Sequence, residues 1–238
     1  MQIIVNSHYG HHQCWQPWVE FFRTAWPDCP YDTVLVSDKC YDHPADFDMK
    51  WSFDEDRGWC ANLLNYLEHI DDACVFLTVD DFWFHKPFNQ EIMIATILAF
   101  VPNIEAYHMT EIACLCLGPC PGPTQEPEGL IGERLPGTDY RICAGPSFWN
   151  VAYLKELLRR IMASPDGPRA TAWDFEITGT IVSNGMPGTI LACKTDVMPF
   201  LHSAMRRGKW HPPTLEVARQ RGIHVDTSGG EFLKEGEY

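Results

Sequence analysis

The chain has 238 residues, 45% of them hydrophobic and 21% charged, a balance typical of a globular protein with a substantial core. The net charge of −14 disfavours a general polyanion-binding surface and docking on anionic lipid. The first residues lack the features of a signal peptide, and no run of about 18 apolar residues predicts a membrane span. We therefore expect a cytoplasmic protein whose ten cysteines are free thiols.

The N-terminal residues predict a strand, a helix and a second strand. Residues 3–5 are a short apolar strand, aromatic side chains at helical spacing follow from Trp15 to Trp26, and residues 33–36 form the second strand. In such a unit both strands end at the same edge of the sheet. Asp38 therefore lies where a ribose or a base can be held, and a solvated loop aspartate explains it equally well.

A second helix is predicted before the central strand. Ser52 and Glu55 form a capping-box pattern, and residues 59–70 show apolar side chains at helical spacing. Asp56 and Arg57 lie at the polar start of this helix, near the cleft if the helix enters from that side.

A buried strand that ends in two carboxylates is the most informative segment. Residues 73–79 are uncharged and rich in β-branched and aromatic side chains, which predicts a strand in the middle of an α/β sheet. Asp80 and Asp81 follow at the edge where ligands bind in open α/β sheets. Two charges there are costly to bury without a cation, and carboxylate oxygens suit Mg²⁺ or Mn²⁺. A solvated turn is the alternative.

The middle of the chain gives weaker signals. The aromatic segment 82–87 is placed to cover a bound ligand, and residues 90–101 predict a buried helix. Three cysteines near His108 match zinc spacings poorly, so thiols on a strand are favoured over a zinc site. They are Cys114, Cys116 and Cys120. Residues 118–139 predict a long loop, and residues 140–144 a strand.

Two carboxylates lie close together in a late helix. Residues 145–150 are expected to turn into a helix capped by Asn150. Asp174 and Glu176 then stand beside two aromatic residues, and either is a candidate general base. The alternative is an ordinary helix start, where acidic residues suit the helix dipole. Residues 189–193 predict a late strand.

The C-terminal part contains a cluster of cations in an acidic chain. Beside a flexible glycine, Arg206, Arg207 and Lys209 suit a diphosphate. Residues 213–221 predict a short helix stopped by a glycine, and residues 226–238 a frayed polar tail.

These groups together describe sugar transfer from a nucleotide sugar. A divalent cation on the two aspartates, helped by the C-terminal cations, would stabilise a departing nucleoside diphosphate. A separate carboxylate would take the proton from the attacking hydroxyl.

Short segments that include most of these residues follow one another through most of the chain. They are Asp56-Arg57-Gly58-Trp59, Leu77 to Pro87, Arg134-Leu135-Pro136 with Tyr140-Arg141, Phe148-Trp149-Asn150 with Tyr153-Leu154, Trp173-Asp174-Phe175-Glu176, and Gly208-Lys209-Trp210. The ordered set resembles the small GT-A-type glycosyltransferases of bacterial surface-polysaccharide clusters and phages. The resemblance implies a single GT-A-like, Rossmann-like α/β domain over residues 1–238, with a mixed, mostly parallel central sheet flanked by helices.

The resemblance also implies roles for individual residues. The adjacent aspartates would serve as the Asp-x-Asp-type motif, with Asp81 on Mn²⁺ or Mg²⁺ and Asp80 holding the ribose or a metal-bound water. His202 matches the late histidine that completes metal binding, and Asp174 matches the base of inverting relatives, with Glu176 close by. The nucleoside, most simply that of a UDP-sugar, would be held by Asn6, Ser7, Ser37, Asp38 and Arg57.

Three functions remain open at this point. A glycosyltransferase would act on a glycan or, as in phages, on a hydroxymethylated DNA base, although the acidic charge disfavours DNA. A metal-dependent nucleotidyltransferase or phosphohydrolase would use the same acids, and the lack of a Gly-x4-Gly-Lys-Ser/Thr loop disfavours P-loop enzymes. A non-catalytic nucleotide-sugar-binding module would keep the fold without the chemistry.

Overall fold

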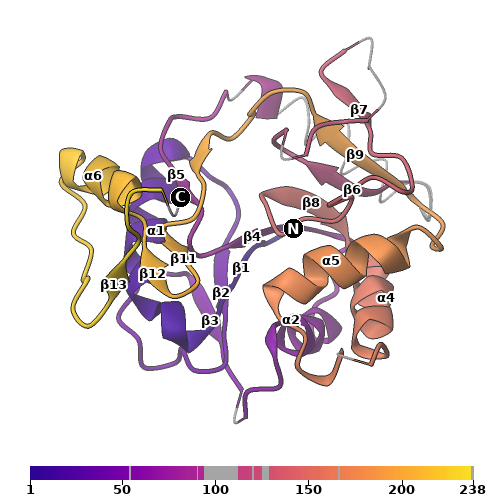
Figure 1. Ribbon diagram of the computed structural model, residues 1–238, viewed down its shortest axis with the longest axis horizontal. Coiled ribbons are helices and arrows are strands. Elements are labelled where there is room, and N and C mark those ends of the chain that lie inside the picture. Colours follow the sequence, from indigo (N-terminus) through magenta and orange to yellow (C-terminus); the bar gives the residue numbers. More distant parts are fainter. Residues whose placement is uncertain are drawn as a thin grey trace.

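An eight-stranded sheet forms the centre of the structure, a computed structural model that describes residues 1–53, 55–89, 91–93, 112–119, 121–124, 129–165 and 167–236. The strand order is β3-β2-β1-β4-β8-β6-β9-β7 (Figure 1). The strands are β1 Ile3–Asn6, β2 Thr33–Val36, β3 Met49–Trp51, β4 Cys74–Val79, β6 Ile112–Cys116, β7 Ile131–Glu133, β8 Ser147–Asn150 and β9 Thr189–Cys193.

Smaller elements surround this sheet. Two short strands, β5 Trp83–Phe84 and β10 Phe200–Leu201, pair with each other. A three-stranded sheet contains β11 Met205–Arg206, β12 Lys209–Trp210 and β13 Glu231–Phe232. The helices are η1 Tyr9–Cys14, α1 Trp15–Ala25, α2 Trp59–Glu68, α4 Val151–Met162, η2 Gly167–Arg169, α5 Ala172–Ser183 and α6 Pro212–Gln220.

The N-terminal half of the large sheet is parallel. β1 pairs with β2 and with β4, with Ile3 opposite Thr33 on one side and opposite Phe76 on the other. β8 then runs antiparallel to both β4 and β6. The C-terminal ends of β1, β2 and β4 therefore meet at one edge of the sheet, and this edge is where the polar residues gather.

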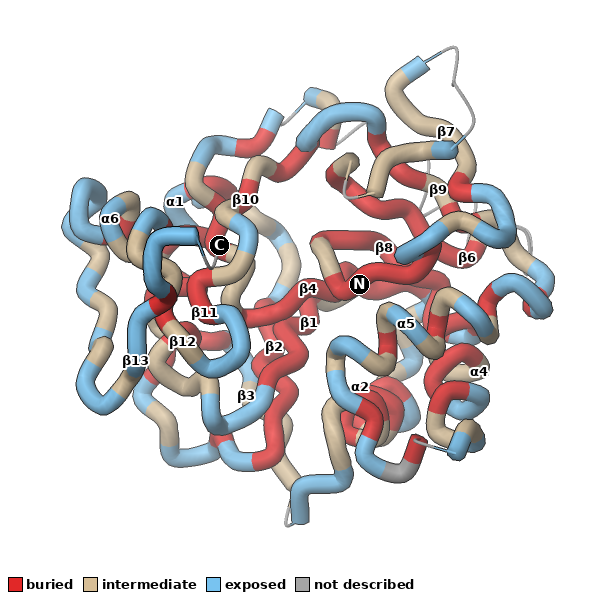
Figure 2. The backbone as a smooth tube through the Cα atoms, viewed as in Figure 1, coloured by how far each residue is buried: buried red, intermediate tan, exposed pale blue. Residues whose placement is uncertain are grey.

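Apolar side chains fill a layer on each face of the sheet. Successive strand residues point to opposite faces, so Ile3 and Val5 pack in the layer with α1, while Ile4 packs in the layer with α2, α4 and α5. Figure 1 shows these helices on the two sides of the sheet, and Figure 2 shows the strands β1, β2 and β4 buried along their length. None of the helices in the described ranges has the length and apolarity needed to cross a bilayer.

The second helix begins differently from the prediction. The expected capping box of Ser52 and Glu55 is wrong, because α2 starts after Gly58, which has no side-chain cap. Gly58 adopts a φ of 92°, and a Cβ there would lie 2.9 Å from the backbone of Arg169. The N–H of Cys60 donates to the carbonyl of Ala170 at 3.1 Å. The start of α2 is thus set by a close backbone contact that only glycine allows.

The predicted strand at 140–144 and the predicted turn at 145–150 are also wrong. The strand of this region is β8, and the residues before it form bends. Tyr140 has a φ of 52°, which interrupts an extended chain. The guanidinium of Arg141, 1% exposed, donates to the carbonyls of Arg134, Ser183 and Gly188 and so fixes the bends. Asn150 does cap α4, because its side chain accepts from the N–H of Tyr153.

Two segments expected to be irregular contain structure. Within the predicted loop 118–139, β7 forms the edge of the large sheet. The predicted frayed tail contains β13, which pairs with β12, and Leu233 is buried beside it. Most of the predicted helix 90–101, together with His108 and Cys120, lies outside the described residues.

Candidate functional site

A cavity of about 520 Å³ opens at the C-terminal ends of β1 and β4. In Figure 1 the short strands β11 and β12 lie to one side of these strand ends and α5 lies to the other. The lining residues are Ser7, His8, His11, Asp56, Gly58, Trp59, Val79, Asp80, Asp81, Phe82, Ala144, Arg169, Thr171, Ala172, Trp173, Glu176, Ser203, Met205, Arg206, Arg207 and Gly208. The cavity therefore joins six separate parts of the chain.

Asp80 is held by a chain of hydrogen bonds at the floor of the cavity. The Ser7 hydroxyl donates to Asp80 Oδ2 at 2.6 Å, and Trp15 Nε1 donates to the Ser7 Oγ at 2.7 Å. His11 Nδ1 lies 3.7 Å from Asp80 Oδ1. The Asp80 carboxylate raises the pKa of His11 to about 9, so the imidazole is protonated at neutral pH and balances the aspartate charge.

Among the described residues, no cation forms an ion pair with the Asp81 carboxylate. Burial, followed by the neighbouring Asp80 carboxylate, raises the pKa of Asp81 well above the usual range of an aspartate. Its backbone carbonyl accepts from the N–H of Ala204 at 2.7 Å, which ties the C-terminal segment to the aspartate pair. The two adjacent carboxylates offer the oxygen ligands that a divalent cation requires, so these residues fit the expected metal.

The two carboxylates of α5 have separate surroundings. Asp174 Oδ2 accepts from the N–H and the hydroxyl of Thr171, both at 2.7 Å, and so completes a capping box, while Asp174 itself does not line the cavity. Glu176 lines the cavity, and its Oε1 accepts from the N–H of Ala144 at 2.9 Å. Burial raises the pKa of Glu176 to about 7. Glu176 thus combines a place in the cavity lining with a pKa near neutrality.

The C-terminal cations are divided by their hairpin. Arg206 and Arg207 line the cavity, whereas Lys209 Nζ lies 3.3 Å from Glu231 in the three-stranded sheet. Ser203 and Arg207 have φ values of 55° and 53°, so the backbone beside the cavity is strained. His202 lies outside the lining, and its ring packs against the rings of Phe82 and Phe200.

Only some of the residues expected to hold the nucleoside line the cavity. Ser7 lines the cavity, while Asn6, Asp38 and Arg57 do not. Asn6 is fully buried and donates from Nδ2 to the carbonyl of Trp59 at 3.1 Å. Asp38 Oδ1 accepts from the N–H of Tyr9 at 2.6 Å, which fixes the turn that follows β1. Arg57 is exposed.

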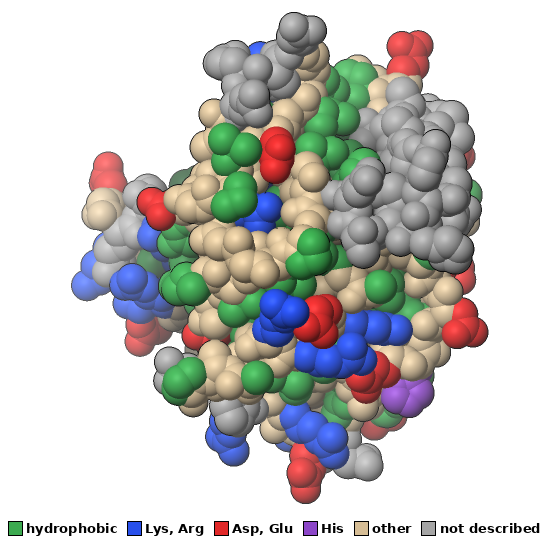
Figure 3. All heavy atoms as spheres, turned by 90° about the vertical axis from the view of Figure 1, so that its right-hand side faces the viewer, with side chains coloured by type: hydrophobic (Ala, Val, Ile, Leu, Met, Phe, Trp, Pro, Cys, Tyr) green, Lys and Arg blue, Asp and Glu red, His purple; other side chains and the backbone are tan. Residues whose placement is uncertain are grey.

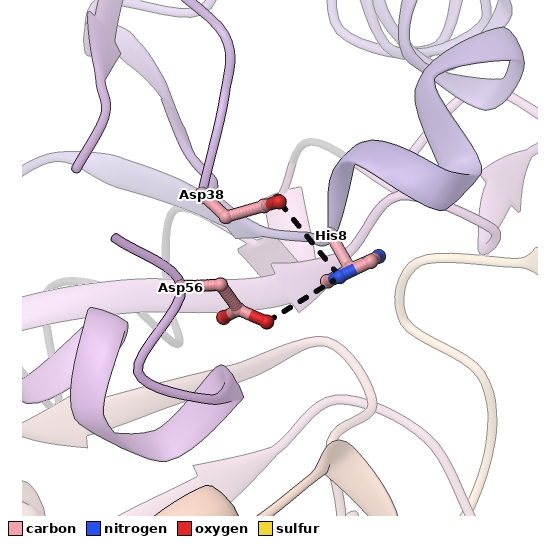
Figure 4. A group of neighbouring side chains, drawn as sticks. All are labelled: His8, Asp38 and Asp56. Carbon is pink, nitrogen blue, oxygen red and sulfur yellow. Dashed lines mark ion pairs between the residues drawn. The ribbon is translucent and has the colours of Figure 1, made fainter. Parts of the chain in front are cut away.

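A second group of possible cation ligands lies at the rim. His8 Nε2 is 3.8 Å from Asp38 Oδ2 and 3.7 Å from Asp56 Oδ2 (Figure 4). The ligand atoms of the three residues lie within 4.8 Å of one another. Figure 4 shows the three side chains converging from the loops after β1 and β2 and before α2. Direct contacts of His8 with the two carboxylates explain the same geometry without a metal.

Sequence reasoning assigned no site role to several cavity residues, among them His8, His11, Arg169 and Trp173. The two histidines follow a strand whose next residues had already been singled out, so their position was a usable signal. Arg169 reaches the cavity only because η2 packs against the start of α2, a contact between distant segments. Trp173 stands beside the two carboxylates in the sequence, and this position was the available signal.

The structure contradicts the expectation for the aromatic segment and agrees with that for the cysteines. The aromatic segment 82–87 does not cover a ligand as expected, because Trp83 and Phe84 are fully buried in the core and only Phe82 lines the cavity. Cys114 and Cys116 are buried thiols of β6 with Sγ atoms 3.7 Å apart, in line with the favoured interpretation.

No family model matches the sequence, and no curated protein sequence matches it. Solved structures do align with it. The 2-C-methyl-D-erythritol 4-phosphate cytidylyltransferase of Thermus thermophilus aligns over 94% of this chain and 99% of its own, with 13% identity and a TM-score of 0.52. S. aureus TarS 1-349 aligns over 99% and 68%, with 14% identity and a TM-score of 0.49. TarS 1-349 in complex with UDP aligns over 82% and 59%, with 14% identity and a TM-score of 0.48. The chain thus has the α/β fold of the cytidylyltransferase.

Proposed function

We propose that this chain is a metal-dependent glycosyltransferase that moves a sugar from a nucleotide sugar, most simply a UDP-sugar, to an acceptor hydroxyl. The main support is that one cavity brings together an aspartate pair, a carboxylate with a pKa near 7 and two arginines. The ordered sequence segments that resemble GT-A-type glycosyltransferases point the same way.

The donor end of the cavity has the charges that a nucleoside diphosphate needs. Asp81 and Asp80 would hold Mn²⁺ or Mg²⁺, which supplies positive charge to the leaving diphosphate. Arg206 and Arg207 line the same cavity and would donate to phosphate oxygens. Ser7 and His11 hold Asp80 in place, so the aspartate does not have to reorganise when the donor binds.

The acceptor end has a base in place. The N–H of Ala144 orients Glu176, and burial keeps its pKa near neutrality, where a base is most effective. We propose that Glu176, not Asp174, takes the proton from the acceptor hydroxyl. Asp174 is engaged in capping α5, and His202 and Lys209 have no place in this proposal because both lie outside the cavity.

A glycan is the acceptor class that the surface charges favour. On the face seen in Figure 3, Lys and Arg side chains are interspersed with Asp and Glu. Ion pairs such as Arg159–Glu68 and Arg160–Glu156 neutralise several surface cations. DNA binding depends mainly on cations that contact phosphates, so a modified DNA base is the second candidate.

A nucleotidyltransferase is the alternative function, and the shared fold with a cytidylyltransferase favours it. The same acids and arginines would then act on a nucleoside triphosphate. Release of pyrophosphate would identify this reaction, whereas release of a nucleoside diphosphate would identify sugar transfer. Binding of nucleotides without turnover would identify a non-catalytic module.

The deciding experiment is thermal unfolding with a panel of nucleotides and nucleotide sugars, each with and without Mn²⁺. A ligand at 100 times its dissociation constant adds roughly 2.7 kcal/mol to the free energy of unfolding. A Mn²⁺-dependent shift with UDP and with one UDP-sugar is expected. A shift only with nucleoside triphosphates would support the alternative, and no shift with any nucleotide would contradict both.

A further inference from the structure

The outer face of α5 is apolar where the helix passes the cavity. Trp173, Ile177 and Ile181 follow one another at the spacing i, i+4, i+8 and are 56%, 52% and 68% exposed. The opposite face of α5 packs into the core through the fully buried Phe175. A helix that is apolar on two sides is unusual for an element that faces solvent, so the outer side calls for a ligand or a partner.

Trp173 differs from the two isoleucines because it lines the cavity. Glu176 lies three residues further on, and residues at this spacing share one side of a helix. Only Oε1 of Glu176 has a hydrogen-bond partner among the described residues, which leaves Oε2 for a substrate hydroxyl. No other ring of the described residues packs against the indole of Trp173. An open aromatic face and a free carboxylate oxygen thus occupy the same wall.

The charged groups near Trp173 have both signs. Residues 172–183 include Asp174 and Glu176 and neither Lys nor Arg, but Asp174 caps the helix outside the cavity lining and Arg169 lines the cavity just before the helix. A nucleic-acid phosphate on the indole would lie near the Glu176 carboxylate as well as Arg169, so these charges give it no advantage over an uncharged ligand. A sugar ring brings no charge, packs its C–H face on an aromatic ring, and points its hydroxyls outward. The wall therefore fits a neutral sugar.

We propose that Trp173 is the platform on which the ring of the acceptor sugar packs, an inference that rests on the proposed glycosyltransferase function. The packed ring presents one hydroxyl to Oε2 of Glu176. As the hydroxyl oxygen bonds to the anomeric carbon of the donor, its proton passes to Glu176. The bond from the anomeric carbon to the diphosphate oxygen breaks, and its electrons leave with the nucleoside diphosphate.

The test uses the whole chain with 5-fluorotryptophan at its nine tryptophans, observed by fluorine NMR. Trp173→Phe removes one resonance and so assigns it. UDP and Mn²⁺ are added first, followed by the methyl glycosides of glucose, galactose and N-acetylglucosamine. The Trp173 resonance should move with at least one glycoside. Ile181→Ala, at an even more exposed site on the same helix outside the cavity, should leave this response intact.

Kinetics with the responding glycoside as acceptor give a second readout. Trp173→Ala should raise the KM for the glycoside about tenfold, while the affinity for UDP is unchanged. Trp173→Phe keeps an aromatic face and should retain most of the affinity. An equal loss of UDP affinity in Trp173→Ala would contradict an acceptor platform.

The NMR outcomes separate this inference from the proposed function. UDP shifts with no response of Trp173 to any glycoside would overturn the platform and leave the proposed function standing. A response of Trp173 to a single-stranded oligonucleotide containing 5-hydroxymethylcytosine, and to no glycoside, would overturn the sugar class. A glycoside response without any UDP response would support the platform and contradict the nucleotide-dependent function. Silence toward both ligands would overturn both.

Discussion

Asp174 and Glu176 are two residues apart on one helix, and their neighbours give them different chemistry. Thr171 engages Asp174 in a capping box, while Ala144 and the cavity wall surround Glu176. The sequence shows two equivalent acids, because the residues that distinguish them are a threonine before the helix and a loop about thirty positions earlier. Only the packing of α5 against that loop separates the roles.

The raised pKa of Glu176 predicts how activity depends on pH. A base must be ionised to accept a proton, so transfer should rise through a midpoint at about pH 7. Glu176→Gln keeps an oxygen that can accept from Ala144 and removes the charge, so transfer should fall by roughly 10²–10⁴-fold while UDP binding persists. Initial rates from pH 5.5 to 9 measure both effects.

Asp174→Asn is the matched control for this prediction. It should keep most of the transfer activity and weaken the cap of α5, at a cost of about 1 kcal/mol in the free energy of unfolding. Loss of transfer in Asp174→Asn with an active Glu176→Gln would assign the base to Asp174.

The hairpin between β11 and β12 predicts a difference among its cations. Arg206 and Arg207 line the cavity, and Lys209 pairs with Glu231. Replacing either arginine with alanine removes charge-assisted hydrogen bonds to phosphate and should weaken nucleotide binding by about 1.5–3 kcal/mol. Lys209→Ala should change nucleotide affinity little. Calorimetric titration with UDP and Mn²⁺ gives these values, and an equal loss in Lys209→Ala would refute the division.

The start of α2 predicts a stability effect at the scale of an element. In Gly58→Ala the backbone forces the new alanine to adopt a positive φ, and its Cβ lies 2.9 Å from the backbone of Arg169. The cost should reach about 3 kcal/mol, because neither backbone segment can move away cheaply. Gly137→Ala shares the positive φ, at 87°, with no atom within 4 Å, and should cost about 1–2 kcal/mol. Denaturant unfolding measures both, and equal costs would show that strain alone acts at Gly58.

Local sequence patterns predicted the helices and strands whose formation does not depend on contacts with distant segments. β1, β2, β4, β9, α1 and α2 each show a complete apolar run or helical periodicity, and the structure confirms them. The bends before β8 were not predictable, because Arg141 fixes them through carbonyls of three other segments. The order of strands and helices in the chain was enough to predict that Asp80 lies at the ligand-binding edge of the sheet. The approach of Arg169 to the cavity depends on packing between η2 and α2, which the sequence does not show.

At the scale of the whole molecule, the titrating groups in the cavity should make the metal-free protein less stable as pH rises. Burial raises the pKa of Asp81 and of Glu176 above their unfolded values, and Asp80 raises that of His11 to about 9. The folded state therefore binds more protons than the unfolded state, so each contribution is lost as pH rises through the folded pKa. The window runs from about pH 4 to 7 for the acids and from about 6.5 to 9 for His11.

We therefore expect the Tm of the metal-free protein to fall between pH 6 and pH 9. Glu176→Gln should flatten the lower part of this slope, because it removes one of the titrating groups. Scanning calorimetry in the presence of a chelator measures the effect. A Tm that rises over this interval would show that the acids are ionised without cost.

The segment that closes the cavity follows the large sheet in the chain. Ser203 to Gly208 is synthesised after all eight strands of that sheet, and the bond from Ala204 to Asp81 forms only then. A growing polypeptide that has emerged as far as β9 has its core strands and lacks one wall of the proposed nucleotide site. On the proposed function, capture by a UDP-bearing resin would therefore separate completed chains from stalled ones during translation.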